Sequence, residues 1–157
     1  MVTTLSRSGA PLLPLGQFRF EQVGSQPIGA GGLGVVHRIR IIESNWTAMV
    51  VGTEWAAKTL NNKWAAHPQI RMRFEREIQA LKQMDHPNII TFHGENLPEY
   101  SRFYIMPVFE QTLRKYIAGG GLRGQWREIA QLGASLAEAL DYAHAKGFIH
   151  RDFKPDN

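Results

Sequence analysis

Residues 150–157 read His-Arg-Asp-Phe-Lys-Pro-Asp-Asn and follow Phe148-Ile149. The octapeptide fits the pattern H-R-D-x-K-x-x-N, in which five positions are specified. Five fixed residue types, each with a background of about one in twenty, give a chance expectation on the order of 10⁻⁴ for a chain of this length. The segment is therefore the most specific signal in the sequence.

Upstream of this octapeptide, several short segments have the residue composition of β-strands. Residues 18–23, 35–42 and a run that ends near Leu60 are rich in β-branched or aromatic residues. Two more short strands are predicted, one at residues 89–92 and one at 103–108. These segments follow one another closely, which predicts a mostly antiparallel sheet.

Two longer segments show the apolar spacing of helices. Residues 68–84 carry one apolar stripe, with Pro68 at its start. A second helix is predicted over residues 125–145, and Gly147 is a plausible stop. Its apolar face comprises Ile129, Leu132, Leu136 and Leu140. The order of strands and helices predicts an α+β fold.

The composition of the 157-residue chain excludes several classes of protein. Hydrophobic residues make up 43% and charged residues 20%, which is ordinary for a globular protein. No apolar run reaches the roughly 18 residues of a membrane span, and cysteine is absent. The 18 basic residues are scattered, so we expect no nucleic-acid partner. We expect a cytoplasmic location and leave open an anchor beyond residue 157.

Three glycines near the start of the strand region form the pattern G-x-G-x-x-G. They are Gly29, Gly31 and Gly34, in a chain with 15 glycines, so the pattern alone is a weak signal. Glycine lets the backbone turn sharply and present N–H groups to phosphate oxygens. The dinucleotide-binding interpretation requires a helix after the loop, but strand-like residues follow here. A phosphate-covering loop between strands fits better, and a flexible hairpin is the alternative.

Lys58 and Glu77 form a second candidate constellation. Lys58 ends the third strand pattern, and Glu77 falls within the apolar stripe of the first helix. A carboxylate on a buried face costs free energy unless a cation pairs with it, and Lys58 is the nearest upstream candidate. The alternative is a Glu77 that reaches solvent at the edge of the helix contact.

Taken together, these segments resemble the eukaryotic-type (Hanks-type) serine/threonine protein kinase catalytic domain. The glycine loop, the lysine, the helix glutamate and the octapeptide come in the order of that family. The resemblance implies a kinase-like N-lobe, with an antiparallel sheet and one regulatory helix, followed by the start of a helical C-lobe. It also implies ATP and Mg²⁺ as cofactors and a protein substrate that offers a Ser or Thr hydroxyl.

The same resemblance assigns roles to individual residues. Asp152 would accept the proton of the substrate hydroxyl, and Lys154 would neutralise the γ-phosphate. The position of Lys154, two residues after Asp152, is typical of serine/threonine kinases. Lys58 would bind the α- and β-phosphates, held by Glu77, and Asn157 would hold the metal ion.

The adenine-binding residues are sketched by the same resemblance. Gly29, Gly31 and Gly34 would cover the phosphates. Ile28 is assigned to the nucleotide site as well. The ring would lie against Val36 and Ala56, with Met106 guarding the back of the pocket and the N–H of Phe109 donating to the adenine edge. An ordinary buried strand over residues 103–109 is the alternative for the last two.

The resemblance also predicts a domain organisation. Residues 1–17 would be a lead-in segment, and 18–157 a partial kinase domain. Within it the N-lobe would span about 18–108, the hinge about 107–111 and the start of the C-lobe about 112–157. Mild departures from the family are Trp55, Leu33, Phe153 and a long stretch from Gly34 to Lys58.

The Asp-Phe-Gly motif and activation loop of the family are not within these 157 residues. We therefore expect the chain alone to transfer phosphate weakly or not at all. We also expect the apolar face of the second helix to need a partner or the rest of a C-lobe to cover it. A non-catalytic ATP-binding or regulatory kinase-like module is the alternative function.

Overall fold

The computed structural model describes residues 18–31, 34–64, 66–96 and 103–156. The chain divides into two compact units. The sheet unit runs to Lys82 and resumes at Phe92–Val108, and the helical unit comprises Gln83–Thr91 and the chain from Phe109 onward. The domain boundaries expected from the resemblance stay a prediction.

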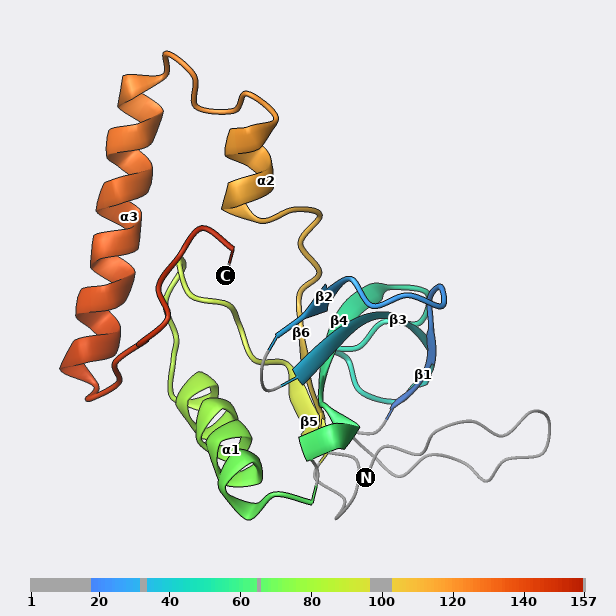
Figure 1. The fold of residues 1–157 in the computed structure, drawn as a ribbon. Helices are drawn as coiled ribbons and strands as arrows, with labels where there is room; N and C mark the ends of the chain where they lie inside the picture. Colours follow the sequence, from blue (N-terminus) through green and yellow to red (C-terminus); the bar gives the residue numbers. More distant parts are fainter. Residues whose placement is uncertain (1–17, 32–33, 65, 97–102, 157) are drawn as a thin grey trace, which may run out of the picture. The chain divides into compact units, whose positions relative to one another are not determined.

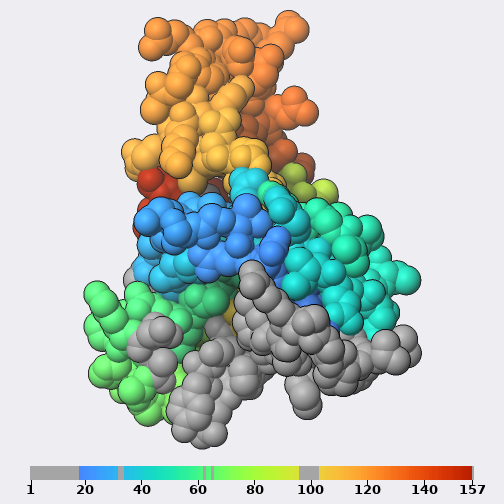
Figure 2. Space-filling view, turned by 90° about the vertical axis from the view of Figure 1, so that its right-hand side faces the viewer, coloured from blue at the N-terminus to red at the C-terminus, as the bar shows by residue number. Residues whose placement is uncertain are grey.

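Within the described residues, the sheet unit is built on one antiparallel sheet of six strands (Figure 1). The strands are β1 (Phe18–Gln22), β2 (Gly29–Ala30), β3 (Gly34–Ser44), β4 (Glu54–Leu60), β5 (Gly94–Asn96) and β6 (Phe103–Met106). Their order in the sheet is β1-β3-β4-β6-β5, with β2 paired to β3. In the space-filling view of Figure 2, β1 to β3, coloured blue to cyan, lie together at the surface.

The two faces of the sheet have different apolar clusters because successive side chains of a strand point to opposite faces. One cluster comprises Phe18, Ile39, Ile41, Met49, Ala57, Phe103 and Ile105. The other comprises Leu60 and Tyr104 from the sheet and Phe74 and Ile78 from a helix. The second face therefore carries the helix.

That helix is α1 (Pro68–Lys82), and it begins at the predicted proline. Phe74 and Ile78, four residues apart, are both fully buried. Burial of two large side chains on one stripe stabilises the helix against the sheet far more than helix propensity does. A short 3-10 helix, η1 (Asn62–Trp64), connects β4 to α1.

The predicted strand at residues 89–92 is wrong, because the strand in this region is β5, which begins at Gly94. A turn holds residues 86–89 instead, with the Ile89 N–H donating to the His86 carbonyl at 3.0 Å. The Asn88 side chain also donates to the Ser135 carbonyl at 3.2 Å. The first bond closes the turn, and the second joins it to Ser135 in the helical unit.

The helical unit contains α2 (Leu113–Ala118) and α3 (Trp126–Ala145). The Lys115 N–H donates to Thr112 Oγ1 at 3.3 Å, so Thr112 caps the start of α2. The predicted helix over 125–145 corresponds to α3. Gly147 follows with a φ of 80°, which agrees with its expected role as a stop.

The architecture is α+β, as the sequence predicts: an antiparallel sheet that carries one helix, and then a helical region. Among the helices that the structure describes, none combines the length and apolar character that a membrane span requires.

Candidate functional site

The predicted ion pair between Lys58 and Glu77 is present in the sheet unit. Lys58 extends from β4, and its Nζ contacts Glu77 Oε1 on α1. The two side chains keep 22% and 29% of their area exposed. The ammonium is thus held by a carboxylate, in a pair of side chains that are each partly exposed.

Tyr104 of β6 is a third member of this group, and sequence reasoning did not single it out. Its O–H donates to Glu77 Oε1 at 2.6 Å, and Lys58 Nζ lies 5.8 Å from the centre of its ring. Burial first, and then the charge of Glu77, raise the pKa of Tyr104 far above its usual range, so the phenol stays a donor. Strand alternation places Tyr104 on the same face as Met106, and that signal could have found it.

The glycine-rich turn lies between β2 and β3, so it leads from strand to strand. Ile28 N–H donates to the Val36 carbonyl at 2.8 Å, and Gly31 N–H donates to the Gly34 carbonyl at 2.9 Å. A Cβ at Gly34 would stand 2.6 Å from the Thr59 carbonyl oxygen. This close approach brings the turn against β4 beside Lys58. The strand β3 that follows the turn excludes the dinucleotide-binding alternative, which needs a helix after the loop.

The apolar residues assigned to the nucleotide site lie in both units. Ala56 is 2% exposed and is the register partner of Met106 on β6. Val36 is half-buried on β3, opposite Lys58. Ile28 is 43% exposed, just before β2. Their assignment to the nucleotide site stays a prediction.

Along the chain, the boundary between the two units falls between Met106 and Phe109. Met106 ends β6, two residues earlier than the predicted strand, and packs against the cluster under α1. Phe109 belongs to the helical unit, and 66% of it is exposed. The assigned role of its N–H stays a prediction.

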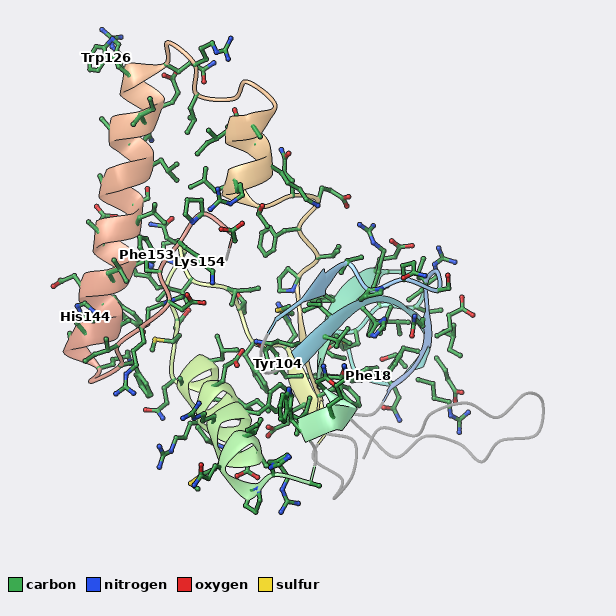
Figure 3. The ribbon with its side chains drawn as sticks, viewed as in Figure 1. Phe18, Tyr104, Trp126, His144, Phe153 and Lys154 are labelled. Atoms are coloured by element: carbon green, nitrogen blue, oxygen red, sulfur yellow. The ribbon has the colours of Figure 1, made fainter. Side chains whose placement is uncertain are left out.

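The octapeptide follows α3 in the helical unit, where Figure 3 labels Phe153 and Lys154. Lys154 Nζ donates to both carboxylate oxygens of Asp152, at 2.9 and 2.8 Å. The side chain of Asp152 is 63% exposed. A carboxylate that is both oriented by a cation and open to solvent can accept a proton from a bound hydroxyl.

The far end of the octapeptide is anchored to α2. Arg114 donates from Nε and Nη2 to the two oxygens of Asp156, at 2.5 and 2.7 Å, and its backbone N–H donates to the Pro155 carbonyl at 2.9 Å. The hydrogen bonds from Arg114 lower the pKa of Asp156, and those same bonds raise the pKa of Arg114. Sequence reasoning missed Arg114, since no periodic pattern marks a six-residue helix.

Asn157, the residue assigned to the metal, lies outside the described residues. Within the ranges that the structure describes, no three His, Asp or Glu side chains gather in a cluster that could hold a metal ion.

Comparisons with known proteins agree with this geometry. The family model described as "Protein kinase domain" matches residues 23–157. The serine/threonine-protein kinase PknD of Protochlamydia amoebophila is 35% identical over 103 residues, which are 58% of this chain and 10% of that protein. PknJ of Mycobacterium tuberculosis, named a serine/threonine-protein kinase, is 31% identical over 149 residues, which are 89% of this chain and 22% of that protein.

A solved structure shows the same fold. The crystal structure of a point mutant of the Mycobacterium tuberculosis PknI kinase domain aligns with a TM-score of 0.63 at 24% identity, over 88% of this chain and 53% of that chain. The chain spans 9% to 39% of the length of curated relatives such as these. The matched range includes the glycine turn, the Lys58–Glu77 pair and the octapeptide. On this evidence the chain has a kinase-like fold and belongs to the protein kinase domain family.

Proposed function

We propose that this chain carries the phosphate-binding and acceptor-activating groups of an ATP-dependent protein serine/threonine phosphotransferase. The observation that carries the proposal is the Lys58–Glu77 ion pair beside the glycine turn. Structural ion pairs between a strand and a helix are common, but this one lies beside a glycine turn: a Cβ at Gly34 would stand 3.3 Å from Lys58 Cε, and the turn is open at Gly31. A cation and a close, side-chain-free backbone suit the oxygens of a polyphosphate.

The residues of the sheet unit suit the nucleotide. Lys58 would neutralise charge on the α- and β-phosphates, and Glu77 would hold its ammonium in place. The backbone around Gly31 would approach the phosphates, because a Cβ at Gly31 would meet nothing within 4 Å and the turn is open there. Buried Ala56 and half-buried Val36 would offer an apolar wall to the adenine.

The residues of the helical unit suit the phosphoryl acceptor. The oxygen of a substrate serine or threonine would attack the γ-phosphorus, the bond from that phosphorus to the β–γ bridging oxygen would break, and ADP would leave. Asp152 would take the hydroxyl proton, and Lys154 would neutralise charge on the transferred group. The magnesium ion that the family generally uses would supply further charge neutralisation, with Asn157 as its assigned ligand.

Serine and threonine are favoured as acceptors over tyrosine by two observations. Lys154 stands two residues after Asp152, and the relatives carry serine/threonine-protein kinase in their names.

The test is a phosphotransfer and ATP-binding assay on the protein as its source encodes it. Lys58→Met should weaken ATP binding and slow turnover together, since the lysine meets the phosphates in both ground and transition states. Asp152→Asn should lower kcat by about 10²- to 10⁴-fold and leave ATP binding intact, because it removes only the proton acceptor. Phosphoamino-acid analysis should find phosphoserine or phosphothreonine.

Matched controls are Lys63→Met and Asp141→Asn, which change an exposed lysine in η1 and an exposed aspartate in α3. Both should behave as the unaltered protein. Equal loss of ATP binding in the Lys58 and Asp152 variants would contradict the assigned roles. ATP binding without any transfer in the unaltered protein would identify a non-catalytic module instead.

A further inference from the structure

The phenol of Tyr104 is buried beside the Lys58–Glu77 pair. Tyr104 is 3% exposed, and a buried hydroxyl is costly unless it forms a hydrogen bond. Its O–H donates to Glu77 Oε1 at 2.6 Å, and Lys58 Nζ contacts the same oxygen. One carboxylate oxygen therefore receives two donors from neighbouring strands.

The strand register explains why Tyr104 reaches this position. On β6, Tyr104 is the register partner of Lys58 on β4 and of Glu95 on β5. Residues directly opposite on paired strands project from the same face of a sheet. Lys58, Tyr104 and Glu95 thus form one row, which we call the polar row, on the face that carries α1; Figure 3 shows Tyr104 between the strands and α1.

Helix α1 meets the polar row at successive turns. The ring of Phe74 lies 5.8 Å from the ring of Tyr104, measured between centroids. Glu77, three residues later, contacts Lys58 and the Tyr104 hydroxyl. Lys82, the last residue of α1, forms an ion pair with Glu95. The Tyr104 side chain therefore gives α1 both an apolar contact and a hydrogen bond at the centre of the row.

We propose that Tyr104 is a positioning residue, whose hydroxyl fixes the carboxylate of Glu77, and with it α1, so that Lys58 is ready for nucleotide phosphates. The role rests on the proposed function, because it concerns the same site. A hydrogen bond to a charged group is stronger than a neutral one, and it holds the carboxylate to one orientation. Lys58 alone, on its flexible stem, imposes less restraint.

Tyr104→Phe tests this role, because it removes the hydroxyl and keeps the ring that packs on Phe74. In the protein as its source encodes it, we expect KM for ATP to rise about tenfold, near the lower end of what the loss of one hydrogen bond to a charged group gives. A purely structural loss would lower the active fraction, and hence kcat, and leave KM unchanged. Tyr116→Phe is the matched control, since Tyr116 is 41% exposed on α2, and it should change neither constant.

Combining Tyr104→Phe with Glu77→Gln shows whether Tyr104 acts through Glu77. If it does, the Tyr104 substitution should cause little further rise in KM once the carboxylate is gone. An unchanged KM in Tyr104→Phe, or an equal rise in both backgrounds, would overturn the proposal.

Hydrogen exchange of the α1 amides, residues 68–82, provides a readout that needs no nucleotide. Exchange should be faster in Tyr104→Phe than in the unaltered protein and unchanged in Tyr116→Phe. Unaltered α1 exchange in Tyr104→Phe would refute the positioning role. A protein that binds no ATP would refute the proposed function, and the exchange comparison would still decide whether Tyr104 holds α1.

Discussion

Gly34 has no room for a side chain, whereas Gly31, in the same turn, has ample room. An added Cβ at Gly34 would stand 2.6 Å from the Thr59 carbonyl oxygen, and at Gly31 it would meet nothing within 4 Å. Backbone atoms of a paired strand cannot move aside as the end of a flexible side chain can. Packing therefore requires a glycine at position 34 but not at position 31, where the proposed nucleotide site would use the open backbone.

Gly34→Ala should accordingly destabilise the protein, and Gly31→Ala should not. Overpacking of this kind costs roughly 1–3 kcal/mol, while a change at an exposed and open position stays within about 0.5 kcal/mol. Urea denaturation of both variants beside the unaltered protein measures the difference. A Gly34→Ala variant as stable as Gly31→Ala would contradict this, because it would show that the β4 backbone at Thr59 can move aside at little cost in free energy.

At single residues, the sequence predicted those parts of the site that belong to motifs. Lys58 and Glu77 could be paired from helical periodicity and from the cost of a buried carboxylate. Alternation along β6 gives the face on which Tyr104 lies, but its partners could not be predicted, because they depend on the register between β4 and β6. Register is set by tertiary packing and turn geometry, which the local pattern of Phe103–Met106 does not contain.

Among the elements, α2 and the octapeptide illustrate anchoring by a pair of exposed groups. Arg114, in the first turn of α2, contacts Asp156 with two hydrogen bonds and Pro155 with a third. The pair is solvent-exposed, with 63% and 40% of the side chains accessible, so it adds little to global stability. Its effect is local, because it holds Pro155 and Asp156 to α2.

The anchoring pair should respond to acid. Hydrogen bonds from Arg114 lower the pKa of Asp156 below its ordinary 3.8. A group with a lowered pKa in the folded protein contributes its contact above the unfolded pKa and loses it as the pH falls through the folded pKa. The Arg114 Nε–H resonance, followed by NMR, should therefore shift with a midpoint below that ordinary value. A midpoint at or above it, or a titration that persists in Asp156→Asn, would contradict the pairing.

The two helices with a long periodic pattern were predictable, whereas the short strand predicted at residues 89–92 was wrong. Residues 68–84 and 125–145 have apolar stripes, and α1 and α3 lie there. Residues 89–92 have strand-like composition, yet the bond from Asn88 to Ser135 holds the adjacent turn to the helical unit. Strand propensity depends on such tertiary contacts, which the local sequence does not contain. The β propensity of Ile89 and Ile90 therefore predicted a strand that does not form.

At the scale of the whole molecule, the helical unit leaves large apolar side chains of α3 accessible. Trp126 is 68% exposed and Ile129 is 50% exposed, and Figure 3 shows Trp126 at the start of the helix. Leu132, Leu136 and Leu140 on the same stripe are half-buried. Contiguous apolar surface of this kind favours association with another apolar surface.

The 157-residue chain, expressed alone, should therefore self-associate through α3. Light scattering should give a mass that rises with concentration. The double variant Trp126→Gln with Ile129→Gln should shift the mass toward that of a monomer and reduce the binding of an apolar dye. Glu138→Gln, an exposed polar position of the same helix, is the control. A monomer at every concentration, with no dye bound, would show that this surface does not drive association.

The different needs of Gly31 and Gly34 also bear on how descendants of this chain would change. Under the proposed function, a descendant that had lost nucleotide binding would keep Gly34, because folding alone demands it beside the Thr59 carbonyl. Position 31 would accept residues other than glycine once no ligand had to approach the backbone there. The number of glycines in the turn is thus a weak marker of a working site among such descendants, and the residue at position 31 is the informative one.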